Sequence, residues 1–207
     1  MLQLREVTIR SNGKLQLYNC SCDLPKRSMI VASNHYHLTT LANAFCGKHS
    51  IENGKIILDT KNDKHKKKIF YNLPYNYTEK WRHYTISEIL SIWKYPKQNS
   101  EIFHKYQFDI NCKLNDLTKV QQFIYWVSVG KSLQRQFFIL NNSFQYFDYL
   151  DWKVLERFLK EDFNRESFLL LSHRCESVLN EDIDAIFEIN TQHQLTLKGG
   201  EKDGDCK

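Results

Sequence analysis

The stretch Phe137-Phe-Ile-Leu-Asn-Asn-Ser-Phe-Gln-Tyr-Phe-Asp148 says most about the fold of this chain. Its large apolar residues, 137–140, predict a short strand buried on both faces, as in the middle of a parallel sheet. Two amides, Asn141 and Asn142, follow where the strand should leave the core. An amide has the shape of a carboxylate, but it carries no charge and takes no proton at neutral pH. The strand is therefore expected to end in a neutral polar edge.

The composition indicates one folded domain. The chain has 207 residues, of which 42% are hydrophobic and 14% aromatic, so a packed core is expected and wholesale disorder is excluded. No apolar run reaches the roughly 18 residues that indicate a membrane span, and the N-terminus lacks a secretory apolar region, so a cytoplasmic location is expected. The net charge of +5 comes without a recognised nucleic-acid motif, and no nucleic-acid partner is predicted.

Cysteine and histidine spacing does not predict a metal site. Cys20 and Cys22 share one face of a predicted strand, where buried thiols are favoured over a disulfide or metal role in a reducing compartment. His35 and His37 form a His-x-His pair, which offers fewer ligands than the three or four that zinc takes.

Hydrophobic periodicity predicts strands alternating with helices. Strands are expected at 2–10, 15–24, 28–32, 55–59, 137–140, 168–171 and within 187–197, with turns at 11–13 and 52–54. Helices are expected at 39–47, 86–93, 101–108, 118–133, 150–161 and 176–186. This order indicates an α/β core in a single domain, 1–198, with a helical insert at about 79–118. The tail 199–207 has no apolar anchor and is expected to be disordered.

Several segments stand in a fixed order around the quoted strand. They are Ala32-Ser-Asn-His-Tyr-His-Leu-Thr-Thr40 before a helical pattern ending at Gly47, Leu117-Thr-Lys-Val-Gln121, Asp148, and Ser172-His173 after an apolar run. Together they resemble the ATP-binding cassette of ABC transporters, from Met1 to about Lys198. The resemblance implies a RecA-like P-loop NTPase core with an N-terminal antiparallel β subdomain and a helical subdomain insert.

The segment that resembles a phosphate loop lacks the residues that bind phosphate. Leu38 stands where such loops have Lys, and Ala32, His35 and His37 stand where they have Gly. What the resemblance leaves as a vestigial nucleotide contact is Asn34, Thr39 and Thr40. The alternative, which the residues favour, is a surface loop whose helix is capped by Thr39 or Thr40.

The other family positions are partly retained. By resemblance, Asn141 and Asn142 replace the carboxylates that hold Mg²⁺ and activate water, so no catalytic residue is expected. Thr118 and Gln121 remain from the signature segment, without its glycines. Asp148 and His173 match the D-loop aspartate and the switch histidine, where packing and catalysis are equally open as their roles.

The resemblance implies a catalytically inactive ATP-binding-cassette subunit, a pseudo-ATPase, on the inner face of the cell membrane. It would dock an integral membrane permease and pair with an active ATPase subunit or a second copy of itself. Aromatic residues of the helical insert supply either docking surface or core: Trp81, Tyr84, Trp93 and Tyr95. No tightly bound cofactor is expected, and weak binding of ATP and Mg²⁺ stays open.

Two other functions are weighed against this one. The chain could be a soluble regulatory or interaction protein that keeps the fold without transport or hydrolysis. An exposed apolar patch on the helical insert would speak against that alternative. A working ATPase with substitute residues is disfavoured, because residues 28–47 contain no Lys or Arg to replace the lost charge.

Overall fold

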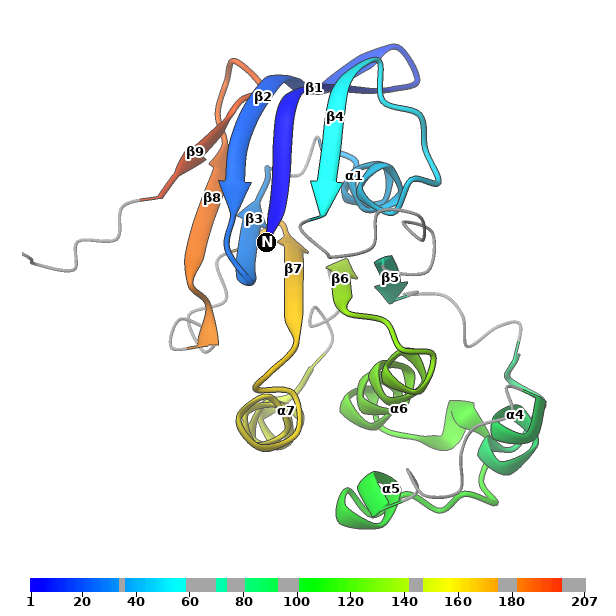
Figure 1. Ribbon diagram of the computed structural model, residues 1–207. Coiled ribbons are helices and arrows are strands. Elements are labelled where there is room, and N and C mark those ends of the chain that lie inside the picture. Colours follow the sequence, from blue (N-terminus) through cyan, green and yellow to red (C-terminus); the bar gives the residue numbers. More distant parts are fainter. Residues whose placement is uncertain are drawn as a thin grey trace, which may run out of the picture.

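The chain folds around two sheets that share one core (Figure 1). The computed structural model describes residues 1–33, 36–58, 70–73 (backbone only), 81–92, 101–141, 147–174 and 182–198. The smaller sheet is antiparallel, in the order β2-β1-β4, and consists of β1 (Leu2–Ser11), β2 (Lys14–Leu24) and β4 (Asn53–Leu58).

The larger sheet has the order β5-β6-β7-β3-β8-β9 and is parallel except for β9. Its strands are β3 (Arg27–Val31), β5 (Phe70–Leu73), β6 (Phe137–Asn141), β7 (Ser167–Ser172), β8 (Ala185–Ile189) and β9 (Leu195–Leu197). The helices are α1 (Leu38–Phe45), α4 (Ile86–Ile92), α5 (Glu101–Lys105), the 3₁₀ turn η3 (Leu114–Asp116), α6 (Lys119–Ser132) and α7 (Tyr149–Glu161). None of the described helices is both long and apolar enough to cross a bilayer.

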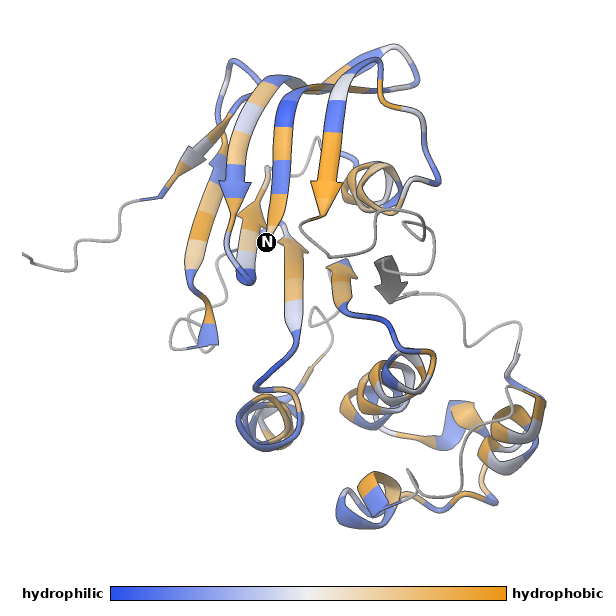
Figure 2. Ribbon diagram, viewed as in Figure 1, coloured by the Kyte–Doolittle hydropathy of each residue, from blue (hydrophilic) through white to orange (hydrophobic). Residues whose placement is uncertain are grey.

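Strand β6 is apolar throughout because both of its faces are covered. Phe138 and Leu140 belong to a core that includes α6 and α7, whereas Phe137 and Ile139 belong to a core with α1 and the smaller sheet. Successive side chains of a strand point to opposite faces, so one continuous apolar run serves both cores. Figure 2 shows the contrast, with β6 and most of β7 coloured as hydrophobic and β1 alternating. The buried parallel strand predicted from 137–140 is confirmed.

The predicted hairpin and the end of the first helix are also confirmed. Asn12 and Gly13 join β1 to β2 with positive φ angles of 49° and 75°, which suit a tight hairpin turn. Gly47 follows α1 with a φ of 68°, and its N–H bonds to Ala44 O. A left-handed glycine in this place ends a helix without steric cost.

Three predicted elements are wrong in part. Of the turn expected at 52–54, Asn53 and Gly54 instead begin β4, where a Cβ on Gly54 would lie 2.4 Å from the carbonyl oxygens of Arg5 and Glu6. Glycine is present there because β1 passes too close for any side chain. The helix expected at 101–108 ends at Lys105, since Gln107 has a φ of 56° and Phe108 N turns back to Phe103 O.

The helix expected at 176–186 overlaps a strand. Ala185 and Ile186 begin β8, which pairs with Ser28 and Met29 of β3. Pairing in the central sheet overrides a weak helical pattern. Residues 175–181 and the tail 199–207 lie outside the described residues, so the disordered tail, the domain limits and the extent of the insert stay predictions.

Candidate functional site

The ends of β3, β6 and β7 meet at the start of α1. Asn141, the last residue of β6, donates a hydrogen bond from Nδ2 to Thr39 Oγ1 at 3.2 Å. His173, directly after β7, donates from Nδ1 to Ala32 O at 2.9 Å. The carboxyl ends of parallel strands are where α/β sheets bind ligands. Three predicted site residues, Thr39, Asn141 and His173, are thus brought to one edge of the sheet.

Asn141 fixes the chemistry of this edge. Its side chain is 7% exposed, and its Oδ1 is buried without a hydrogen-bond partner among the described residues. Its Nδ2 is a donor that faces the Thr39 hydroxyl, which must accept the bond. The amide brings no negative charge to offset that of Mg²⁺, whereas a carboxylate would. This edge of the sheet is therefore neutral, and the Asn141 amide is already engaged in a hydrogen bond with Thr39.

Leu38 is a core residue. It is 5% exposed and belongs to the hydrophobic cluster that contains Leu41 and Phe45 of the same helix. Leu38, at the position where the resemblance predicts a lysine, therefore stabilises the fold by apolar burial. No cationic side chain replaces it in α1.

The cap expected at Thr39 or Thr40 is wrong. Helix α1 begins at Leu38 with His37 as N-cap, and it has no side-chain cap bond. Thr39 and Thr40 lie within the first turn, where Thr40 Oγ1 is 3.0 Å from Ser11 Oγ of β1. The Thr39 and Thr40 side chains contact β6 and β1. Both residues lie inside the helix, so neither is its N-cap.

Sequence reasoning missed Gln16. Its side chain, 2% exposed on the inner face of β2, accepts a hydrogen bond at Oε1 from His37 N at 2.7 Å. The same segment is held by Tyr36, which is buried, donates from its hydroxyl to Asn190 O at 3.2 Å and packs edge-on against His193. The sequence carried no signal for this contact, because a polar residue between Leu15 and Leu17 in a strand predicts an exposed side chain.

The retained Asp148 is the N-cap of α7. Its Oδ1 accepts from Asp151 N at 2.8 Å. Of the two roles left open for Asp148, the structure shows hydrogen bonding at a helix end. Asn34, His35 and Asn142 lie outside the described residues, so the His-x-His pair and the second amide are untested.

Thr118 and Gln121 form a capping box at the start of α6. Thr118 Oγ1 accepts from Gln121 N at 3.2 Å, and Gln121 Oε1 accepts from Thr118 N at 3.1 Å. The buried Asp151 carboxylate of α7 lies near this helix end, because the Val120 N–H and the Thr118 hydroxyl, with the Asp148 N–H, act to lower its pKa. Burial and the neighbouring Asp148 charge raise the pKa of Asp151 above its usual value. Thr118 and Gln121, which the resemblance predicts as signature positions, thus serve here as the N-terminal cap of α6.

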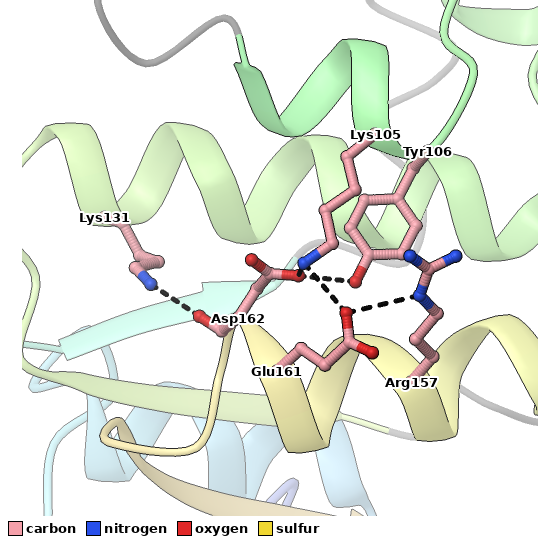
Figure 3. Close-up of polar contacts among 6 residues, drawn as sticks. All are labelled: Lys105, Tyr106, Lys131, Arg157, Glu161 and Asp162. Atoms are coloured by element: carbon pink, nitrogen blue, oxygen red, sulfur yellow. Dashed lines mark hydrogen bonds and ion pairs between the residues drawn. The ribbon is translucent and has the colours of Figure 1, made fainter.

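A cavity of about 270 Å³ opens beside these helix ends. It is lined by Lys105, Tyr106, Gln107, Thr118, Val120, Gln121, Leu150, Asp151, Val154 and Arg157. A polar cluster forms one wall and ties α5 to the end of α7 (Figure 3). Asp162 Oδ2 accepts from Lys105 Nζ at 2.6 Å and from the Tyr106 hydroxyl at 2.5 Å. The cavity's cations are already paired, since Lys105 and Arg157 both contact Glu161.

Burial and hydrogen bonds within this cluster shift the pKa values of Asp162 and Tyr106. Burial raises the pKa of Asp162, but the hydrogen bonds from Lys105 and Tyr106 outweigh it and hold that pKa below its usual value. Burial, with the hydrogen bond to Asp162, raises the pKa of Tyr106. Asp162 therefore stays ionised and Tyr106 stays protonated at neutral pH.

The cysteines of β2 are inert thiols. Cys20 is buried, Cys22 is partly buried, and both are free. Burial raises the pKa of Cys20, and burial with the charges of Cys20 and Asp23 raises that of Cys22 to about 11. A protonated thiol is a poor nucleophile and metal ligand. The expected buried thiol is confirmed at Cys20, whereas Cys22 is a free thiol that is only partly buried.

Comparison with solved structures decides the fold. A cassette of an ABC transporter, MJ1267, superposes with a TM-score of 0.81 at 16% identity, covering 98% of this chain and 92% of its own. A nucleotide-free cassette of an ABC transporter gives 0.77 at 12% identity, with 98% and 92% covered. This chain has the ATP-binding-cassette fold.

The cassette fold extends over nearly the whole chain and includes the N-terminal antiparallel sheet and the mixed α/β core. A further cassette structure is cbiO1 from Clostridium perfringens, part of the ABC transporter complex cbiONQ, with a TM-score of 0.71, 13% identity and 96% and 87% coverage. No protein-family model matches the sequence, and no curated protein matches it. The predicted fold is confirmed.

Proposed function

We propose that this cassette is a degenerate subunit of an ABC transport complex that does not hydrolyse ATP. It docks a membrane permease on the cytoplasmic side and pairs with an active ATPase subunit or with a second copy of itself. The observation that carries the proposal is the hydrogen bond from Asn141 Nδ2 to Thr39 Oγ1. A hydrogen-bond donor occupies the place where phosphoryl transfer needs an anionic ligand for Mg²⁺.

The neighbouring residues support the same conclusion. Leu38 is packed in the core, so the start of α1 has no cation to neutralise a triphosphate. Phosphoryl transfer depends almost wholly on positioning and electrostatic stabilisation, so the loss of the cation and the metal ligand together should abolish turnover. Cofactor binding is proposed to be limited to weak contact of ATP with the vestigial positions Thr39 and Thr40.

Apolar surface on the helical insert supports permease docking. Tyr84, Ile92 and Ile110 are exposed large hydrophobic residues of this region. Trp81 is half-buried and packs against the Tyr84 ring at 5.6 Å, so it contributes to the core as well as to this surface. Trp93 and Tyr95 lie outside the described residues. Docking requires these exposed side chains to form one contiguous apolar patch, which is the kind of surface that marks an interaction site.

The test is an ATPase assay on the purified full chain with Mg²⁺, beside the Thr39→Ala variant. The wild type is expected to show no phosphate release above background, and Thr39→Ala no change from it. Turnover by the wild type that Thr39→Ala removes would show a working site and overturn the proposal. Calorimetry should also give no ATP–Mg²⁺ binding at micromolar concentration, whereas micromolar affinity would contradict the vestigial role of the loop.

A further inference from the structure

The cavity between α5, α6 and α7 is a preformed space whose walls are held by hydrogen bonds. Gln121 of α6 donates from Nε2 to Tyr106 O and Gln107 O at 3.3 and 3.4 Å, which ties α6 to the chain that follows α5. Tyr106 in turn donates from its hydroxyl to Asp162 at the end of α7. The volume of about 270 Å³ suits a small ligand. Because the walls are fixed, a ligand would enter without rearranging the helices.

The lining of this cavity has an apolar middle between two charged ends. Leu150 and Val154 line it from α7, and Val120 lines it from α6. Asp151 and Arg157 line it from the same helix, on either side of Val154. Their backbones lie about 9 Å apart along the helix axis, at a rise of about 1.5 Å per residue. The cavity therefore presents a carboxylate and a guanidinium at opposite ends of an apolar wall.

Asp151 is a buried carboxylate without a cation beside it. Its side chain is 8% exposed. Burial and the neighbouring Asp148 charge raise its pKa, and among the described residues only hydrogen-bond donors act to lower it. Buried charges in proteins are normally paired, because the loss of hydration is otherwise not offset. A ligand cation at this end of the cavity would supply the missing partner.

The other end of the cavity carries cationic N–H groups that are not fully used. Arg157 Nε donates to Glu161 at 3.2 Å, whereas its terminal nitrogens bond no group among the described residues. Figure 3 shows these nitrogens turned away from Glu161, beside the Tyr106 ring. The Lys105 ammonium and the Arg157 guanidinium lie 5.6 and 5.9 Å from the centroid of that ring. The two terminal nitrogens of a guanidinium match the two oxygens of a ligand carboxylate.

We propose that this cavity binds a small zwitterion whose ammonium and carboxylate are separated by an apolar body, with the ammonium at Asp151 and the carboxylate at Arg157. An ω-amino acid is the simplest ligand of this class. An α-amino acid does not fit, because both of its charges are carried at one end. The inference goes beyond the proposed function and does not rest on it, since no residue of the cavity belongs to the edge formed by β3, β6 and β7.

Calorimetry at pH 7 on the full chain tests the class of ligand. We expect 6-aminohexanoate to bind with a millimolar or lower Kd. Hexanoate and hexylamine keep the apolar chain but only one charge, and norleucine is an isomer with both charges at one end. Each of these three should bind at least about tenfold more weakly. No saturable binding of 6-aminohexanoate below about 10 mM, or an equal affinity for norleucine, overturns the proposal.

Arg157→Gln tests the carboxylate end of the ligand. This substitution at an exposed position should weaken the binding of 6-aminohexanoate about tenfold and leave that of hexylamine unchanged. Lys160→Gln is the matched control, because Lys160 also pairs with a glutamate one turn away on α7 but does not line the cavity. It should change neither affinity. Equal losses for both ligands in Arg157→Gln, or the same loss in the control, overturn the proposal.

Asp151→Asn tests the ammonium end and keeps an oxygen acceptor beside the helix ends. It should weaken the binding of 6-aminohexanoate about tenfold and leave that of hexanoate unchanged. An unchanged affinity for 6-aminohexanoate in the folded variant overturns the proposal. If circular dichroism shows that Asp151→Asn does not fold, the comparison of Arg157→Gln with Lys160→Gln decides. ATP turnover by the wild type would defeat the proposed function and leave this site untouched, so the two failures are distinguishable.

Discussion

Single residues at the start of α1 contribute packing and neutral hydrogen bonds in place of charge. Leu38 places an aliphatic side chain in the core, and Asn141 forms a neutral hydrogen bond with Thr39. A buried carboxylate in the Asn141 position would need a cation to offset the cost of leaving water. Without bound metal, the neutral pair is the more stable arrangement. These residues therefore stabilise the folded chain in the absence of nucleotide and metal.

Asn141→Asp tests this view. The substitution is expected to lower the free energy of unfolding by about 2 kcal/mol at pH 7, because a carboxylate would be buried beside a hydroxyl with no cation. Urea unfolding followed by circular dichroism measures the change. Asn115→Asp, at an exposed position of η3, is the control and should change stability little. A loss as small as that of the control would contradict the account of the site.

At the scale of elements, the N-termini of α6 and α7 meet beside one carboxylate. Backbone N–H groups of both helix ends and the Thr118 hydroxyl act to lower the pKa of the buried Asp151, while Asp148 caps α7 alone. Each helix end has N–H groups without partners in its own helix, so a shared acceptor satisfies both at once. Two predicted binding positions, Thr118 and Gln121, form the cap at the α6 side of this contact.

Replacement of Asp151 should therefore cost more than replacement of Asp148. Asp151→Ala is expected to lower the free energy of unfolding by about 2–3 kcal/mol, since the N–H groups of two helix ends would lose the buried carboxylate that lies beside them. Asp148→Ala should cost about 1 kcal/mol, as for an ordinary N-cap. Guanidinium unfolding of both variants gives the comparison. Equal costs would mean that Asp151 does not bridge the helices.

The cluster in Figure 3 predicts a pH dependence for the contact of α5 with α7. The pKa of Asp162 lies below its usual value, so the folded state holds this proton less tightly than the unfolded chain. Its stabilisation is complete above the unfolded value of about 3.9 and is lost as pH falls through the folded value. Melting temperatures between about pH 2 and 4 should fall more steeply for the wild type than for Asp162→Asn.

The control for this experiment is Asp116→Asn, at an exposed carboxylate of η3. Its melting curve should keep the steep acid dependence of the wild type. Tyr106→Phe removes the 2.5 Å hydrogen bond to Asp162 and should weaken the dependence as Asp162→Asn does. If the melting temperature fell with pH at the same rate in the wild type and in all three variants, the charges of the cluster would not be coupled to folding.

At the scale of the whole molecule, the sequence predicted the architecture better than the site. Period-two alternation and the apolar run at 137–140 suffice to predict the strands of the two sheets, because the pattern of apolar residues in a strand shows which of its faces are buried. Gln16 and His37 are 21 residues apart, and no local pattern connects them. The start of β8 was mistaken for helix because its pairing with β3 is also long-range. Contacts between segments that are distant in the sequence decide the chemistry of the candidate site, and no local sequence pattern reveals such contacts.

The whole molecule also sets the last prediction, on the docking surface. Ile92 of α4 is 55% exposed on the helical insert, and Leu197 of β9 is 63% exposed on the far end of the larger sheet. If the insert binds a permease, a tagged wild-type chain should recover an integral membrane protein from native membranes. Ile92→Glu should reduce that recovery at least about tenfold, since a charge in an apolar interface costs more than 1.4 kcal/mol.

Leu197→Glu is the matched control, because it places the same charge on an equally exposed apolar position outside the insert. Both variants should fold, since neither side chain is buried, and circular dichroism checks this. Equal recovery with Ile92→Glu and Leu197→Glu would remove the insert as the docking surface. A second cassette in the same pull-down, lost with neither variant, would place subunit pairing elsewhere on the molecule. The two contacts of a transport subunit, with its permease and with its partner cassette, would then be separated by one pair of substitutions.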